Sequence, residues 1–304
     1  MRHFFVLFGF FSILFPYVTA SSAELNGVLL EDKYVQSGNA KIHYVASGEG
    51  PLVVFIHGFP DYWYTWRHQM TTLMDSYRVV AMDTRGYNQS SKPTEQEEYD
   101  MGLLVKDVKA VVDAEDRKEA IIVGHDWGGM IAWTFATTYP ETTKNLVIVN
   151  LPHPRGLRRE LANNKEQYAN AEYARNFQKP ESHKFINIEG LAKFVGRDEK
   201  TTQRYLEAFK RSSTLGMMNY YRQNYPKPPY SDLKWDMPNV EMPVLQFHGL
   251  KDTALHRNGL NGTWDWINED YTLVTIPDAG HWSHIDKPEL VSKTMKFWLD
   301  IRNK

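Results

Sequence analysis

The sequence predicts an α/β protein with a mostly parallel, doubly wound sheet and an inserted helical cap. Short apolar runs alternate with segments of helical periodicity, both before residue 150 and after residue 243. Runs such as Leu52–Ile56 contain no polar residue, which is typical of strands buried on both faces. Buried strands that alternate with helices favour a parallel sheet covered by helices on both sides. The expected strands are residues 41–45, 52–56, 78–82, 120–123, 146–149, 244–247 and 271–274.

The expected cap interrupts this alternation. Residues 152–236 are polar, helix-like and rich in tyrosine, and prolines stand near both ends. Ordinary connections between strands are far shorter, so this segment is expected to fold as helices over the sheet rather than as a loop. The sheet core then comes in two parts, residues 24–151 and 237–304.

The first 23 residues have the features of a secretory signal peptide. Arg2 supplies a positive charge, and the uncharged run Phe4–Phe15 is shorter than the ~20 residues that a membrane-spanning helix needs. Small residues place a cleavage site after Ala20 or Ala23. We therefore expect an exported protein, periplasmic or secreted, without a stable membrane anchor after cleavage; an uncleaved anchor is the alternative.

Composition excludes several classes of function. The chain has 35 Lys and Arg residues and 37 Asp and Glu residues, so its net charge is −2. Nucleic-acid-binding proteins normally carry a clear excess of basic residues, so this balance argues against that function. The absence of cysteine excludes disulfides, thiolate metal sites and a cysteine nucleophile. No ligand cluster has the spacing of a metal site, so neither a metal nor an organic cofactor is expected. The oligomeric state stays open, with a homodimer as one alternative.

The motif Gly124-His125-Asp126-Trp127-Gly128-Gly129 follows a buried run and precedes a helical pattern. A strand, a sharp glycine-flanked turn and a helix form a nucleophile elbow, here with Asp126 at its centre instead of serine. A carboxylate is already an anion at neutral pH, and its attack on an sp³ carbon leaves an ester that water can hydrolyse. This chemistry suits epoxide opening or halide displacement. The structural alternative is an aspartate that caps the helix.

The partners of Asp126 are expected at the same sheet edge. His281 and Asp252 each follow a strand, and the order nucleophile, acid, histidine is that of elbow hydrolases. Asp252 would hold the His281 tautomer while His281 takes a proton from water. Asp278 is a second candidate acid. The backbone N–H groups of Phe59 and Trp127 are the expected oxyanion donors.

Four motifs together resemble the soluble epoxide hydrolases of the α/β-hydrolase superfamily. They are the segments 57–69 (HGFPDYWYTWRHQ), 83–87 (DTRGY), 124–129 (GHDWGG) and 280–282 (GHW). The resemblance covers nearly all of the chain after the leader and implies the α/β-hydrolase fold, a small apolar epoxide as substrate and water as co-substrate. We expect His57, Pro60, Trp63 and Tyr220 at the substrate pocket, His57 in a packing role rather than as base.

The resemblance also implies two cap tyrosines that hold and protonate the epoxide oxygen. Tyr221, which precedes Arg222, matches the second tyrosine segment, and Tyr173 matches the first. Tyr168 and Tyr220 are the alternatives. A phenol with a pKa near 10 can hydrogen-bond the ring oxygen and then give up its proton.

Three other functions compete with epoxide hydrolysis. A haloalkane dehalogenase would use the same Asp126, but such enzymes typically carry asparagine or tryptophan where this chain has Phe59. Fluoroacetate dehalogenases typically have arginine where Trp127 stands. A non-catalytic binder of apolar ligands would have no need to retain nucleophile, acid and base together.

Overall fold

An eight-stranded sheet forms the centre of the computed structural model, which describes residues 23–231 and 237–303. The expected leader therefore lies outside the described residues, apart from Ala23. Strand β4 pairs antiparallel with β3 on one side and with β6 on the other, and every other pair in this sheet is parallel. In spatial order the strands are β10 (Tyr271–Ile276), β9 (Val244–Gly249), β8 (Thr143–Val149), β7 (Ala120–His125), β5 (Leu52–Ile56), β6 (Arg78–Met82), β4 (Ala40–Ser47) and β3 (Glu31–Ser37).

The predicted fold class is confirmed, with adjustments at its edge. Strand β3 pairs with β4 and extends the sheet by one strand. The sequence pattern did not predict this strand, because its exposed and buried positions alternate irregularly. A short hairpin, β1 (Glu24–Leu25) with β2 (Val28–Leu29), stands apart from the main sheet. The inner strands β5 and β7 are buried at every position, as their apolar runs predicted.

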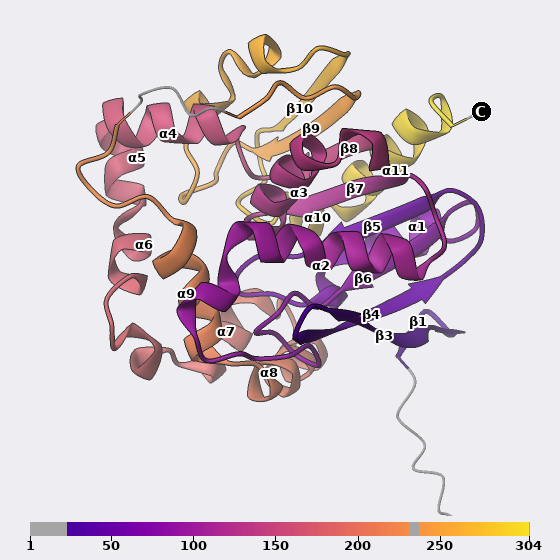
Figure 1. The fold of residues 1–304 in the computed structure, drawn as a ribbon, viewed down its shortest axis with the longest axis horizontal. Coiled ribbons are helices and arrows are strands. Elements are labelled where there is room, and N and C mark those ends of the chain that lie inside the picture. Colours follow the sequence, from indigo (N-terminus) through magenta and orange to yellow (C-terminus); the bar gives the residue numbers. More distant parts are fainter. Residues whose placement is uncertain (1–22, 232–236, 304) are drawn as a thin grey trace, which may run out of the picture.

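Helices cover both faces of the sheet (Figure 1). Helix α2 carries the expected apolar stripe toward the core, and Asp100 caps it by accepting a hydrogen bond from the N–H of Gly102 at 2.9 Å. Helix α3 begins at Trp127, directly after Asp126. The core helices are α1 (Arg67–Leu73), α2 (Met101–Ala114), α3 (Trp127–Thr138), α10 (Ser283–Asp286) and α11 (Pro288–Asp300).

Among the described residues, six α-helices lie between β8 and β9 and form a layer beside the sheet (Figure 1). Two tyrosines fasten this layer to core loops: the Tyr205 hydroxyl donates to Asp61 Oδ1 and the Tyr220 hydroxyl to the Arg85 carbonyl, both at 2.8 Å. The cap helices are α4 (Pro154–Asn163), α5 (Lys165–Asn170), α6 (Glu172–Phe177), α7 (Ile188–Val195), α8 (Glu199–Arg211) and α9 (Thr214–Asn224).

Within the described residues, no helix combines the length and the apolar character needed to cross a membrane. The carboxyl ends of the parallel strands β5, β7, β8, β9 and β10 all meet at one edge of the sheet, because parallel strands run in the same direction. The loops that leave this edge carry the predicted site residues.

Candidate active site

Asp126 lies in a strained turn between β7 and α3. Its φ of 52° and ψ of −122° place a non-glycine residue in a sparsely populated region of backbone space. It stands at the N-cap position of α3, yet its side chain makes no capping hydrogen bond. The carboxylate instead accepts a 2.7 Å hydrogen bond at Oδ1 from the backbone N–H of Phe59. The helix-capping alternative therefore does not describe this side chain.

Glycines make room for the turn and for the carboxylate. A Cβ atom on Gly128 would lie 2.1 Å from the Ile56 carbonyl oxygen. A Cβ atom on Gly58 would lie 2.3 Å from Asp126 Oδ1 and 2.4 Å from Asp126 Cβ. Gly58 has no positive φ, so its backbone conformation does not require glycine. Glycine is needed at this position because Asp126 approaches too closely for a side chain to fit.

His281 lies between two carboxylates. Its Nδ1 is 2.8 Å from Asp252 Oδ2, and its Nε2 is 3.5 Å from Asp126 Oδ2. Asp252 is itself fixed, because its Oδ1 accepts from the backbone N–H groups of Ala254 at 2.8 Å and Leu255 at 3.0 Å. Asp278, the second candidate acid, forms a surface ion pair with Lys287 instead. The three residues that the sequence placed on separate strand ends therefore meet in space.

A small cavity, about 20 Å³, brings Asp126 together with cap residues. Tyr173 on α6 and Tyr221 on α9 both line it, and their ring centroids are 6.0 Å apart. The Trp127 ring packs edge-on against Tyr221 at 5.1 Å, and Phe59 does so at 5.7 Å. Aromatic packing therefore holds the two cap tyrosine rings at the cavity that Asp126 also lines.

Comparison with known proteins places this constellation in a family. A model of the α/β hydrolase fold matches residues 51–288, which span the elbow, the cap and the histidine. The chain belongs to the α/β-hydrolase fold family.

This α/β-hydrolase is similar to several epoxide hydrolases. It is 33% identical over 290 residues to Epoxide hydrolase 1 of Caenorhabditis elegans, covering 89% of this chain and 70% of that protein. An epoxide hydrolase of Bacillus megaterium, solved with an inhibitor, is 31% identical with a TM-score of 0.82, over 88% of this chain and 100% of that chain. A mutant of the Bacillus megaterium enzyme, complexed with its product (R)-3-[1]naphthyloxy-propane-1,2-diol, is 31% identical, with a TM-score of 0.83 and the same coverage.

The charges of the triad support one another. Burial lowers the pKa of His281, but the Asp252 and Asp126 carboxylates outweigh it and raise that pKa to about 10. Burial raises the pKa of Asp126, while the His281 and His125 imidazoles and the Phe59 N–H bring it below its ordinary value. Burial raises the pKa of Asp252 as well, but the His281 imidazole lowers it by more, so the net shift is downward. At neutral pH the free α/β-hydrolase therefore holds an imidazolium between two carboxylates.

Asn150 is a site residue that the sequence reading missed. It follows β8 with a positive φ of 45°, and its Nδ2 donates to Asp252 Oδ2 at 2.9 Å and to the Gly280 carbonyl at 3.2 Å. It thus links the acid to the loop that carries His281. Its position directly after a parallel strand was the available signal, because side chains at such strand ends face the site.

The remaining predicted pocket residues are not among the described side chains that line this cavity. His57 is held at both ring nitrogens, by the Gly58 carbonyl at 2.9 Å and the Thr84 N–H at 3.1 Å, which is a packing role. The Tyr220 hydroxyl is occupied by the Arg85 carbonyl, and Tyr168 is 45% exposed. Pro60 and Trp63 are buried beside the Phe59 turn.

Asp61, His125 and His284 form a buried cluster behind His281 that could hold a metal ion, because their ligand atoms lie within 4.8 Å of one another. Burial lowers the pKa of His125 to about 3, so its imidazole is neutral at pH 7. Its Nε2–H donates to the His281 carbonyl at 2.9 Å, which leaves the lone pair on Nδ1. The three residues come from three separate motifs. Only the fold brings them together, so sequence spacing could not indicate the cluster.

Proposed function

We propose that this α/β-hydrolase converts epoxides to vicinal diols through a covalent ester on Asp126. One observation carries the proposal: the Asp126 carboxylate shares a cavity with Tyr173 and Tyr221 while His281 and Asp252 lie directly behind it. A nucleophile that is an anion, two phenols and a base oriented by an acid are what ring opening followed by ester hydrolysis requires. The epoxide hydrolases to which the chain is similar support the same substrate class.

The first half-reaction alkylates the enzyme. An Asp126 oxygen forms a bond to a ring carbon, the carbon–oxygen bond of the ring breaks, and Tyr173 or Tyr221 gives its proton to the departing oxygen. Burial raises the pKa of both phenols, so neither is an anion before the substrate arrives. Because the ring oxygen becomes a much stronger base as it leaves, the proton transfer accompanies bond breaking.

Esterification prepares the second half-reaction. The neutral ester no longer carries the negative charge that helps to keep His281 protonated, so the pKa of His281 falls. The imidazolium proton returns to the tyrosinate through the cavity, which restores the phenol and leaves His281 neutral.

Water then hydrolyses the ester. His281 takes one proton from a water molecule, and the hydroxide adds to the Asp126 carboxyl carbon. The N–H of Phe59, which donates to Asp126 Oδ1, stabilises the tetrahedral oxyanion. The N–H of Trp127, the first residue of α3, is the proposed second donor. Collapse expels the diol alkoxide, which takes the remaining proton, and the carboxylate and the imidazolium are restored.

The test uses the full chain with styrene oxide and, in parallel, 1-bromobutane. Diol without bromide is the expected result, and bromide without diol would replace this function by dehalogenation. A single turnover in oxygen-18 water should label Asp126, since water attacks its carboxyl carbon. Label confined to the diol after one turnover would show direct attack of water on the epoxide. The His281→Gln variant is the matched control and should accumulate the ester.

A further inference from the structure

The buried cluster behind His281 brings three polar side chains together from distant parts of the chain. Asp61 lies in the loop after β5, His125 is the last residue of β7, and His284 lies in α10. All three side chains are fully buried, and their possible ligand atoms lie within 4.8 Å of one another. The two imidazole rings are 4.6 Å apart between centroids.

Hydrogen bonds assign a free lone pair to each histidine of the cluster. The His281 carbonyl only accepts, so neutral His125 donates through Nε2–H and keeps its lone pair on Nδ1. Nε2 of His284 lies 2.8 Å from Thr65 Oγ1. The Thr65 hydroxyl gives its own proton to the Asp61 carboxylate, so its oxygen accepts from the His284 Nε2–H. The lone pair of His284 is therefore also on Nδ1.

These lone pairs lie beside an excess of negative charge. Among the described residues, neither Nδ1 atom has a hydrogen-bond partner, and a buried polar atom without a partner costs free energy. The triad and the cluster together contain the carboxylates of Asp61, Asp126 and Asp252, and the imidazolium of His281 balances only one of them. A bound cation that accepts lone pairs would satisfy both nitrogen atoms and offset the charge.

We propose that the buried cluster binds a divalent transition-metal ion, with Zn²⁺ as the best match. Two imidazole nitrogens and one carboxylate oxygen are ligands that zinc prefers, and the fourth position would be left to water. Tetrahedral bonds of about 2.0–2.1 Å place ligand atoms about 3.3 Å apart. The cluster must therefore contract by about 1.5 Å at most, which rotation about the broad χ2 torsions of histidine and aspartate can supply.

The atoms that face away from the cluster are held as they are in metal ligands. A ligating histidine normally donates its other ring N–H to an oxygen atom nearby, and both histidines of the cluster do so. Asp61 accepts from the backbone N–H of Tyr62 at 3.0 Å and from the indole N–H of Trp282 at 3.1 Å. Because His281 and Trp282 both bond to members of the cluster, a metal ion there would stiffen the loop that carries the base.

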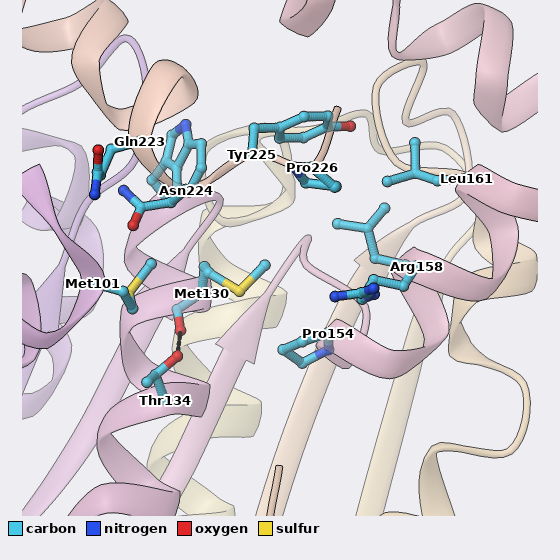
Figure 2. A pocket seen from close by; sticks show the side chains of 12 residues that line it. Met101, Met130, Thr134, Pro154, Arg158, Leu161, Gln223, Asn224, Tyr225 and Pro226 are labelled. Atoms are coloured by element: carbon cyan, nitrogen blue, oxygen red, sulfur yellow. Dashed lines mark hydrogen bonds between the residues drawn. The ribbon is translucent and has the colours of Figure 1, made fainter. Parts of the chain in front are cut away.

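The cluster is separate from the cavities between core and cap. Its members are not among the described side chains that line the catalytic cavity. They are also absent from the lining of a larger cavity of about 330 Å³, whose walls are shown in Figure 2. The competing occupant of the cluster is a water molecule that donates to both Nδ1 atoms.

The test measures zinc binding by the untagged chain after a chelator has removed metal ions. Wild type should retain about one zinc ion per chain, and zinc should raise its unfolding temperature. His284→Gln removes a ligand but keeps an N–H for Thr65, and Asp61→Asn removes the carboxylate charge. Loss of an outer partner alone weakens metal affinity about 10–100-fold, so each variant should weaken it by about a hundredfold or more.

Two control variants should bind zinc as wild type does. His256→Gln removes a histidine that lies 3.2 Å from Glu166 and outside the cluster. His281→Gln removes the base of the triad and leaves the cluster intact. Loss of zinc from His281→Gln would place the ion at the triad and overturn the assignment. Retention of zinc by both cluster variants would overturn it too, and wild type without zinc would leave water as the occupant.

Discussion

Gly58→Ala should disable the nucleophile while leaving the fold in place. The added Cβ would lie 2.3 Å from Asp126 Oδ1, and a comfortable contact begins near 3.4 Å, so one of the two groups must move by about 1 Å. Asp126 cannot simply rotate away, because its own Cβ would be only 2.4 Å from the new methyl group. The carboxylate therefore leaves the N–H of Phe59 and its place opposite His281.

Displacement of a reacting group by about 1 Å can cost about a hundredfold in rate. We expect kcat/KM on styrene oxide to fall by that factor or more, with a stability loss of about 1–3 kcal/mol from overpacking. Steady-state kinetics and thermal unfolding measure the two effects separately.

The matched control is Gly190→Ala in α7, where the nearest atom would lie 3.3 Å away and belongs to the Asn187 side chain. Helix propensity favours alanine there by about 1 kcal/mol, so stability should not fall and activity should be unchanged. A folded Gly58→Ala protein with activity within about threefold of wild type would refute the placement of Asp126 that these distances describe.

Three further predictions concern the same site. Asn150→Ala removes the amide that joins Asp252 to the Gly280 carbonyl. The lost hydrogen bonds contribute about 1–3 kcal/mol, so kcat should fall about tenfold while KM changes little. A change in KM alone would contradict this role. Tyr221→Phe should slow ester formation in a single turnover but leave ester hydrolysis unchanged, and an unchanged rate of ester formation would place the proton donor elsewhere. Because the pKa of His281 is raised to about 10, its stabilising charge is fully present below about pH 6.5 and is lost as pH rises toward 10. The difference in unfolding temperature between wild type and His281→Gln should shrink over that interval, and a constant difference would show that His281 is uncharged.

Local patterns were sufficient for the sheet and the elbow. Strands β5 and β7 are continuous apolar runs, and burial on both faces leaves few alternatives for such runs. The elbow could be predicted from glycine spacing because the close backbone approaches at Gly124 and Gly128 tolerate no side chain. Strand β3 escaped prediction because it is an edge strand whose exposure does not alternate cleanly.

The amino-acid sequence by itself predicted the alternation of strands and helices, and it led to the proposal of Asp126 as nucleophile with His281 and Asp252 as its partners. Each of these depends on residues close together in the chain or on the rule that parallel strands end at one edge. Only the tertiary structure decided that Asn150 supports Asp252, that Asp61, His125 and His284 converge, and that Tyr173 and Tyr221 line one cavity with Asp126. These features depend on contacts between segments that are far apart in the chain, such as Asn150 and Asp252, and on the packing of the cap against the core. Tertiary packing sets the geometry of these contacts, and a local sequence pattern cannot predict it.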